Sequence, residues 1–188
     1  MKQKMNAKDI LVPTLSLFVI ALVSTFLLAL VNNMTADQIA AATAQTEAEA
    51  RQSVCADAAN FVEQEIDGTT YYEATDKDGN VIGYVFTTSY KGYGGDVSAT
   101  VGIDLDGAVT GVVPGDLSNE TPGLGQTATK ESFLKQFLGQ SSALTVVKSN
   151  PGDGEIQALT SATITSTAVT NDVNQALELY AKVTGGAN

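Results

Sequence analysis

Residues 69–90, TTYYEATDKDGNVIGYVFTTSY, decide the fold that the sequence predicts. Two runs rich in Thr, Tyr, Val and Ile, at 69–75 and 81–90, stand on either side of the stretch DKDGN. Residues of these types favour strands, and the pair Asp78-Gly79 is typical of a hairpin turn. This part of the chain therefore predicts a β-hairpin.

Two more strands are predicted after the hairpin, at 97–103 and 108–113, with the turn signal DLDG between them. Strands joined by such short turns pair in antiparallel fashion. Three acidic residues in and after this turn could also suggest a calcium site, namely Asp104, Asp106 and Asp116. An EF-hand loop needs more acidic positions and a terminal Glu at fixed spacing, so the sequence favours a turn.

Helical segments are predicted on both sides of the strands. After them come a short helix at 127–139, a short strand at 143–148, a loop at 149–155 and a helix at 163–183 with one apolar face. Before them, residues 34–66 are rich in Ala, Gln and Glu and contain no Gly or Pro, which predicts a helical stalk. Grouped strands with helices around them indicate an α+β domain.

A membrane helix is predicted at 10–31, where no residue is charged. These 22 residues would reach about 33 Å, enough to cross a hydrocarbon core of about 30 Å. A cleaved signal peptide is the alternative, but its apolar region would be shorter and followed by a small-residue cleavage site. The preceding Lys2, Lys4 and Lys8 predict that the N-terminus lies in the cytoplasm.

The predicted organisation is that of a single-pass protein of the cell (inner) membrane. It has a cytoplasmic N-terminus at 1–9, a transmembrane helix at 10–31 in the lipid bilayer, a stalk at 32–66 and an extracytoplasmic domain at 67–188. The fold class is thus a transmembrane helix and stalk followed by an antiparallel sheet with flanking helices.

Composition excludes several classes of function. The chain has 188 residues, with 10 Lys and Arg against 21 Asp and Glu, and a formal net charge of -11. This acidity argues against a nucleic-acid binder, which needs basic patches. The chain has no His and one cysteine, Cys55. Internal disulfides, His-dependent triads and a Cys-ligated iron–sulfur cluster built from this chain alone are therefore excluded.

Three segments carry residues that could build a ligand site. The first is KGYGGD at 91–96, whose glycines let the backbone approach a flat ligand. Tyr93, and Tyr90 just before the segment, could stack on such a ligand. A flexible hairpin loop is the alternative there. The second is ETPGLG at 120–125, a tightly turned loop with Glu120 at its edge. The third is LTSATITS at 159–166, which opens the last predicted helix.

Hydroxyl side chains are concentrated in the third segment, namely those of Thr160, Ser161, Thr163, Thr165 and Ser166. At a helix start such hydroxyls usually cap the free backbone N–H groups. The same N–H groups, together with the helix dipole, also form a site for an anion such as phosphate. The residues by themselves leave both interpretations open.

The sequence QALTSATITSTAV at 157–169 resembles the flavin-attachment segment of a known family of FMN-binding domains. These domains occur in the G subunit of the Rnf complex and in the C subunit of the sodium-pumping NADH:quinone oxidoreductase. The family pattern is Asp-x-x-Ser/Thr-Gly-Ala-Thr, whose last Thr carries FMN through a phosphoester bond. Along this pattern the chain has Gln157, Thr160, Ser161, Ala162 and Thr163, so Gln and Ser stand at the Asp and Gly positions. GYGG and ETPGLG also resemble loops of this family.

The resemblance implies a covalent FMN on Thr163, attached by a flavin transferase. The other residues expected around the cofactor are Thr160, Ser161, Ala162, Thr165, Gly94, Gly95, Glu120, Thr121 and Leu124. No catalytic side chain and no metal are implied, because the flavin itself does the electron chemistry.

The function implied by the resemblance is that of an electron-transfer subunit in a membrane-bound Rnf-type complex. Such a complex couples electron transfer between ferredoxin and NAD to sodium or proton translocation. The chain would work with other membrane subunits of this oxidoreductase and would not catalyse the overall reaction alone. Two alternatives are a stand-alone membrane-tethered flavoprotein that reduces an outside acceptor, and a scaffold domain without a chromophore.

Overall fold

The structure, a computed structural model, describes residues 7–186. Residues 1–6 and 187–188 lie outside the described part. The prediction that Lys2 and Lys4 flank the membrane helix therefore rests on the sequence alone. Two compact units make up the chain.

The first unit, Met1–Thr46, is helical over its described residues. It belongs to the long helix α1 (Ala7–Val54). An 18-residue window within Ile10–Val54 has a mean hydropathy of 2.6, and none of that window is buried. By length and composition α1 is able to cross a membrane. The bounds of the span, 10–31, stay a prediction.

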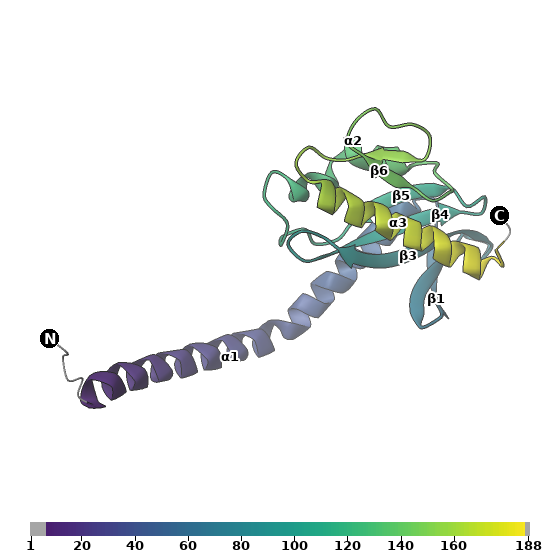
Figure 1. The fold of residues 1–188 in the computed structure, drawn as a ribbon. Coiled ribbons are helices and arrows are strands. Elements are labelled where there is room, and N and C mark those ends of the chain that lie inside the picture. The colour runs from purple at the N-terminus through teal and green to yellow at the C-terminus, as the bar shows by residue number, and fades with distance from the viewer. Residues whose placement is uncertain (1–6, 187–188) are drawn as a thin grey trace. The chain divides into compact units, whose positions relative to one another are not determined.

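The second unit, Glu47–Asn188, contains an antiparallel sheet of five strands in the order β1-β2-β3-β4-β5 (Figure 1). The strands are β1 (Asn60–Ile66), β2 (Thr69–Thr75), β3 (Val81–Lys91), β4 (Asp96–Asp104) and β5 (Val109–Pro114). Each strand pairs with the next in antiparallel fashion. The predicted hairpin is formed by β2 and β3, so the predicted antiparallel sheet is confirmed.

Aspartates stabilise two turns of this sheet. Asp76 Oδ1 accepts the N–H groups of Asp78 and Asn80 at 2.8 and 2.9 Å. Asp104 Oδ1 accepts those of Asp106 and Ala108, each at 2.9 Å. The turn predicted for DLDG is therefore confirmed, and its first carboxylate is engaged with its own turn.

The predicted helix at 34–66 is too long. α1 ends at Val54, and residues 60–66 form β1. The reason is the turn Asp67-Gly68, where both residues have positive φ (51° and 77°) and the chain folds β1 back onto β2. Pairing with β2 satisfies the backbone of β1, and this outweighs the helix propensity of its Gln and Glu residues.

The predicted helix at 127–139 is broken into three short pieces. They are the 3₁₀ turn η1 (Gly125–Thr129), the helix α2 (Glu131–Leu134) and the 3₁₀ turn η2 (Lys135–Phe137). Lys130 has an extended backbone, with φ −65° and ψ 132°, which a continuous helix cannot contain. Phe133 and Phe137 are still buried together, with ring centroids 5.3 Å apart.

Two short strands follow. β6 (Thr145–Val147) lies within the strand predicted at 143–148. The loop predicted at 149–155 overlaps the start of β7 (Glu155–Gln157), which pairs with β6 in parallel. β7 has only three residues, too few for an alternating pattern to reveal it.

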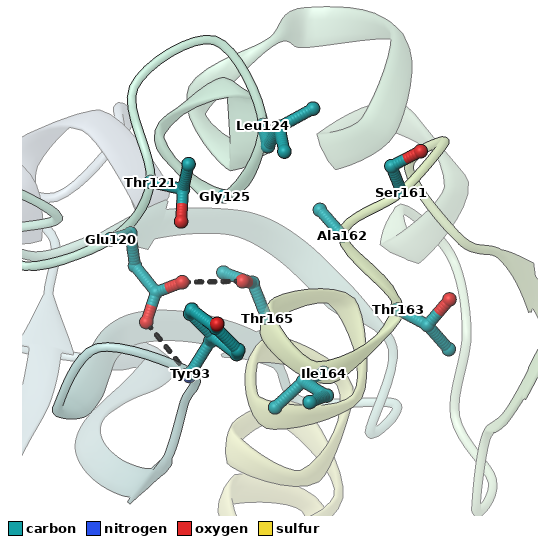
Figure 2. A pocket seen from close by; sticks show the side chains of 10 residues that line it. All are labelled: Tyr93, Glu120, Thr121, Leu124, Gly125, Ser161, Ala162, Thr163, Ile164 and Thr165. Carbon is teal, nitrogen blue, oxygen red and sulfur yellow. Dashed lines mark hydrogen bonds between the residues drawn. The ribbon is translucent and has the colours of Figure 1, made fainter.

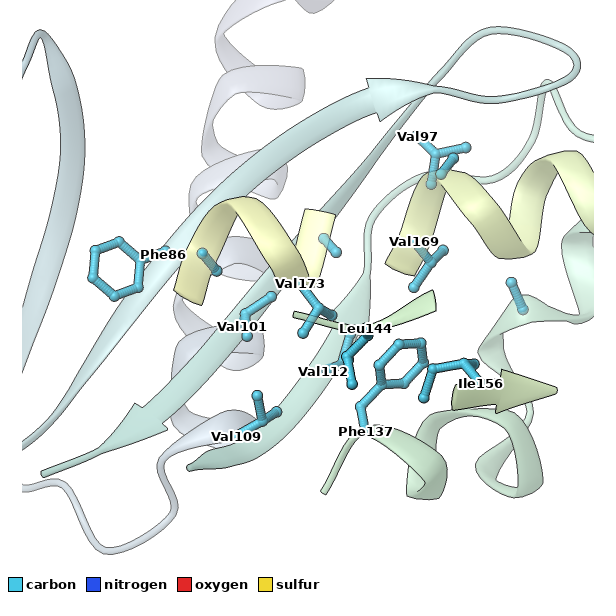
Figure 3. Close-up of a cluster of buried hydrophobic side chains, with 14 of the residues drawn as sticks. Phe86, Val97, Val101, Val109, Val112, Phe137, Leu144, Ile156, Val169 and Val173 are labelled. Atoms are coloured by element: carbon cyan, nitrogen blue, oxygen red, sulfur yellow. The ribbon is translucent and has the colours of Figure 1, made fainter. Parts of the chain in front are cut away.

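Helix α3 (Thr163–Val183) has the predicted bounds and lies across one face of the sheet (Figure 1). Its apolar side packs on β3 and β4 to form the main core (Figure 3). Phe86 and Val101 from the strands and Val169 and Val173 from the helix are fully buried there. This packing fixes the start of α3 beside the loops that follow β3 and β5.

The last turns of α1 cover the other face of the sheet. Val54 packs in a cluster with Ala74 and Val85, and its carbonyl accepts the hydroxyl of Thr110 at 2.6 Å. A Cβ on Gly111 would lie 2.9 Å from Val54 Cα, so this glycine makes room for the helix. Around these residues the sheet is thus covered on both faces.

Candidate flavin site

A pocket of about 460 Å³ opens at the start of α3 (Figure 2). Three segments far apart in the sequence form it: the loop after β3, the loop after β5 and the segment that enters α3. Its lining residues are Tyr93, Glu120, Thr121, Leu124, Gly125, Ser161, Ala162, Thr163, Ile164 and Thr165. The three segments singled out in the sequence therefore meet at one place.

Glu120 joins these segments. Its side chain is 3% exposed. Oε1 accepts the backbone N–H groups of Tyr93 and Gly94, each at 2.9 Å. Oε2 accepts the hydroxyl of Thr165 at 2.6 Å (Figure 2). Each partner is a donor, which is what an ionised carboxylate requires, since it offers acceptors only.

The start of α3 has no side-chain cap. Ala162 takes the cap position, and no described side chain bonds to the free N–H groups there. The hydroxyl of Ser166 instead accepts the N–H of Leu159 at 3.0 Å and donates to the carbonyl of Ala162 at 2.9 Å. The cap interpretation is therefore wrong. The first turn keeps its N–H donors and the positive end of its dipole free for an anion.

Thr163 is the first residue of α3, and its side chain is exposed. Its hydroxyl has no hydrogen-bond partner among the described residues, although its carbonyl accepts the hydroxyl of Thr167 at 2.8 Å. Thr165 differs, because it is 1% exposed and its hydroxyl is engaged by Glu120. Figure 2 shows Thr163 pointing away from Glu120. Of these two threonines, Thr163 is the one available for chemistry.

Comparison with known proteins gives two family matches. Residues 92–178 match the FMN-binding domain, and residues 1–54 match the RnfG N-terminal region. The G subunit of the proton-translocating ferredoxin:NAD(+) oxidoreductase complex of Clostridium ljungdahlii is 43% identical over 126 residues, 64% of this chain and 65% of that protein. The G subunit of the Na(+)-translocating ferredoxin:NAD(+) oxidoreductase complex of Acetobacterium woodii is 38% identical over 186 residues, 88% of this chain and 89% of that protein.

The chain belongs to the RnfG family. A solved structure, that of Shewanella oneidensis NqrC, aligns with a TM-score of 0.49 at 19% identity, over 65% of this chain and 72% of that one. All three segments that line the pocket lie within the stretch that matches the FMN-binding domain.

Most residues that the sequence suggested for the site line the pocket of this RnfG-family chain. Three do not. Gly94 and Gly95 lie in the loop beside it, and Thr160 lines a separate hollow together with Phe133 and Gln136. For Thr160 the physical reason is that the chain turns at Ser161, so that the residues before and after it face different hollows. Gly94 and Gly95 lie against Asn119 instead.

Two residues that line the pocket, Gly125 and Ile164, are not indicated as site residues by the sequence, and Tyr93 is indicated only as a stacking face. Gly125 ends the quoted loop ETPGLG, and Ile164 follows Thr163, so proximity to the motifs was the signal that could have found them. Tyr93 is 70% exposed and Ile164 53% exposed, which gives the mouth of the pocket an apolar character.

Ser161 has a φ of 63°, in the left-handed region that favours glycine. This is the position where the pattern of the FMN-binding domains has Gly. The chain enters α3 through a left-handed backbone conformation at this position. Glycine adopts that conformation without strain, which explains why the pattern has Gly there. Ser161 adopts the same turn at a cost in strain.

A buried acid lies farther along α3. Asp172 is 0% exposed, and neither carboxyl oxygen has a hydrogen-bond partner among the described residues. Burial raises the pKa of Asp172 to about 8. The nearby hydroxyl of Thr88 donates to the main-chain carbonyl of Asp172, at 2.9 Å. Asp172 does not line the pocket.

Proposed function

We propose that this chain is the electron-carrying subunit of an Rnf-type membrane complex and that it holds one FMN covalently on Thr163. One observation carries the proposal. The stretch that matches the FMN-binding domain builds a pocket at an uncapped helix start, and an exposed threonine with a free hydroxyl stands there.

The volume and the lining residues of the pocket suit FMN. Its volume of about 460 Å³ lies within the usual range for small-molecule sites, about 300–1,000 Å³. The free N–H groups of α3 favour the phosphate, and Thr163 would hold it by an ester. The exposed apolar side chains of Tyr93, Leu124 and Ile164 would bind the flat ring. FMN supplies the electron chemistry, while these residues bind and orient it.

The relatives support a place in a complex that moves ions. Both relatives named above are G subunits of ferredoxin:NAD(+) oxidoreductase complexes, one of which translocates protons and the other sodium ions. For this chain we propose the same setting, in which it passes electrons between other membrane subunits while the whole complex couples their transfer to sodium or proton movement.

We also propose that the second unit lies outside the cytoplasm. Lys2, Lys4 and Lys8 precede the apolar part of α1, and basic flanks stay in the cytoplasm. The net charge of -11 would repel a free anionic cofactor. A covalent bond, made by a flavin transferase, therefore keeps FMN on a protein that faces the outer medium.

The test is the intact mass of the full chain, made in a host with a flavin transferase and then denatured. The ester joins the Thr163 oxygen to phosphorus with the loss of one water, so FMN adds roughly 438 Da. Thr163→Val loses the adduct because the acceptor oxygen is gone, whereas Thr163→Ser keeps it. The fold should survive both changes, since the Thr163 hydroxyl bonds to no described residue.

Three results would contradict the proposal. A wild-type chain of unmodified mass would remove the covalent flavin. An adduct retained by Thr163→Val would move the attachment to another residue. A flavin-bearing chain that purifies without any other membrane protein would favour a stand-alone tethered flavoprotein.

A further inference from the structure

Among the described side chains that line the pocket, the buried carboxylate of Glu120 ties all three segments together. It belongs to the loop after β5, and it bonds to backbone N–H groups 27 and 26 residues away and to a hydroxyl 45 residues away. None of these bonds is made within a local turn. Their geometry therefore depends on Glu120 lying where the loop after β3 and the first turn of α3 converge.

Glycines around Glu120 make room for its carboxylate from two sides. A Cβ on Gly92 would stand 2.6 Å from Oε1, and one on Gly125 would collide with Oε2. Gly94 lies against the main chain of Asn119, the residue before Glu120, and a Cβ there would overlap the Asn119 carbonyl. The glycine loop and the loop of Glu120 are therefore fitted to each other as one unit.

We propose that Glu120 is a positioning residue: it holds the loop 92–95 and the first turn of α3 together before any cofactor is attached, and its charge opposes reduction of the flavin. The first half of this inference concerns the protein alone. The second half rests on the proposed function, because it needs a flavin in the pocket.

The hydrogen bonds to Glu120 are strong enough to hold the loop 92–95 in place before a cofactor is attached. Bonds to a charged acceptor are stronger than neutral ones, and each of the three donors is left unsatisfied if the carboxylate is removed. The N–H groups of Tyr93 and Gly94 point at Oε1 and have no other partner in their own loop. Without Glu120 the loop 92–95 loses the contact that ties it to the pocket.

The effect on the flavin follows from Coulomb's law. Glu120 is 3% exposed and lines the pocket, so water screens its charge poorly. Adding electrons to a cofactor in that pocket increases negative charge near a fixed negative charge. Glu120 should therefore lower the midpoint potential of the flavin, and removing the charge should raise it.

The first experiment is amide hydrogen exchange on the full chain made without a flavin transferase. Glu120→Ala should speed exchange at Tyr93 and Gly94 by at least about tenfold, since hydrogen bonds to a charged group are lost. Glu120→Gln should restore slow exchange, because its amide oxygen can accept both N–H groups while its NH₂ faces Thr165. If Glu120→Ala does not fold, Thr165→Val takes its place in the exchange experiment. This variant removes only the hydroxyl that donates to Oε2 of Glu120.

The second experiment is a redox titration of the flavin-loaded chain, in which Glu120→Gln should shift the midpoint potential to more positive values. Glu131→Gln is the matched control, because Glu131 is exposed, pairs with Lys135 at 2.6 Å and does not line the pocket. This control should leave the potential unchanged.

The positioning role of Glu120, the effect of its charge and the proposed function are each tested by a different result. Slow exchange in Glu120→Ala, equal to wild type, would overturn the positioning role. Equal potentials in Glu120→Gln and Glu131→Gln would overturn the role of the charge. A wild-type chain that carries no flavin would contradict the proposed function, and the exchange experiment would still decide the positioning role.

Discussion

Two buried polar side chains on α3 differ in the hydrogen bonds that they make. In the first turn, Thr165 is 1% exposed and donates to Glu120, which receives two further N–H bonds. Two helical turns farther on, Asp172 lies on the same side of the helix and is 0% exposed. Its carboxyl oxygens have no hydrogen-bond partner among the residues that the structure describes.

The comparison shows that burial does not by itself decide what a carboxyl group does. Glu120 is surrounded by donors that suit a carboxylate, so its charge can be kept in the interior. The carboxyl group of Asp172 has no such set of donors. Burial penalises its charged form and raises its pKa to about 8, although the nearby hydroxyl of Thr88 acts to lower that pKa. One acid organises the pocket, whereas the other lowers the stability of the domain when it ionises.

The largest expected effect is the pH dependence that Asp172 imposes on stability. Its pKa is about 8 in the fold and about 3.9 in the unfolded chain. The folded state therefore binds more protons between these values, and the free energy of unfolding falls as pH rises from about 4 to about 8. The full stabilisation is present below pH 4, and the total loss is on the order of a few kcal/mol.

Asp172→Asn should flatten this slope, as measured by chemical denaturation of the full chain at several pH values. Asp106→Asn is the control, because Asp106 lies in an exposed turn, and it should keep the wild-type slope. A wild-type chain whose stability is constant between pH 4 and 8 would show that Asp172 is not kept protonated by its burial.

The next effect tests the other side of the comparison, the loop that supplies donors to Glu120. Gly94→Ala places a Cβ on the main-chain carbonyl of Asn119, so the loop must shift and unfolding becomes easier by about 2–3 kcal/mol. Gly95→Ala has its nearest neighbour, Asn119 Cβ, at 3.6 Å and should change stability by less than about 1 kcal/mol.

Thermal unfolding of the two glycine variants measures this difference. Equal midpoints would mean that the fit between the two loops does not support the pocket. A drop confined to Gly94→Ala would identify the Gly94–Asn119 contact as part of what holds Glu120 in place.

The smallest effect concerns the entry to α3. Ser161→Gly should stabilise the chain by about 1 kcal/mol, because glycine adopts a φ of 63° without strain. Ser132→Gly, within α2, should have the opposite sign because glycine weakens a helix. Denaturation curves of both variants check this, and a destabilised Ser161→Gly would mean that the serine side chain compensates for its backbone.

Much of the fold could be predicted from local patterns. The hairpin of β2 and β3, the next two strands and the bounds of α3 follow from alternation, from Asp-Gly turns and from a helical apolar face. The errors lie where strand pairing or a change of backbone direction decides. β1 forms a strand because the turn Asp67-Gly68 brings it onto β2, and β7 forms because β6 pairs with it. The helix predicted at 127–139 is broken by the extended backbone of Lys130.

The candidate site, too, could be predicted only in part. Its three segments could be found in the sequence, since each has a recognisable composition. Their joining could not, because Glu120 looks like a charged residue at the edge of a turn until its partners, 26 to 45 residues away, are brought to it. The burial of Asp172 was equally invisible, as nothing near it in the sequence marks it as unpartnered.

The sequence by itself determined the elements whose stabilising contacts are local: the apolar helix, the Asp-Gly turns and the hydroxyl-rich start of α3. Only the tertiary structure decided which polar groups are buried, which of them have donors and which threonine keeps its hydroxyl free. The physical reason is that turns and helices satisfy their backbone within a few residues, whereas the partners of a buried side chain come from any part of the chain that folding places beside it.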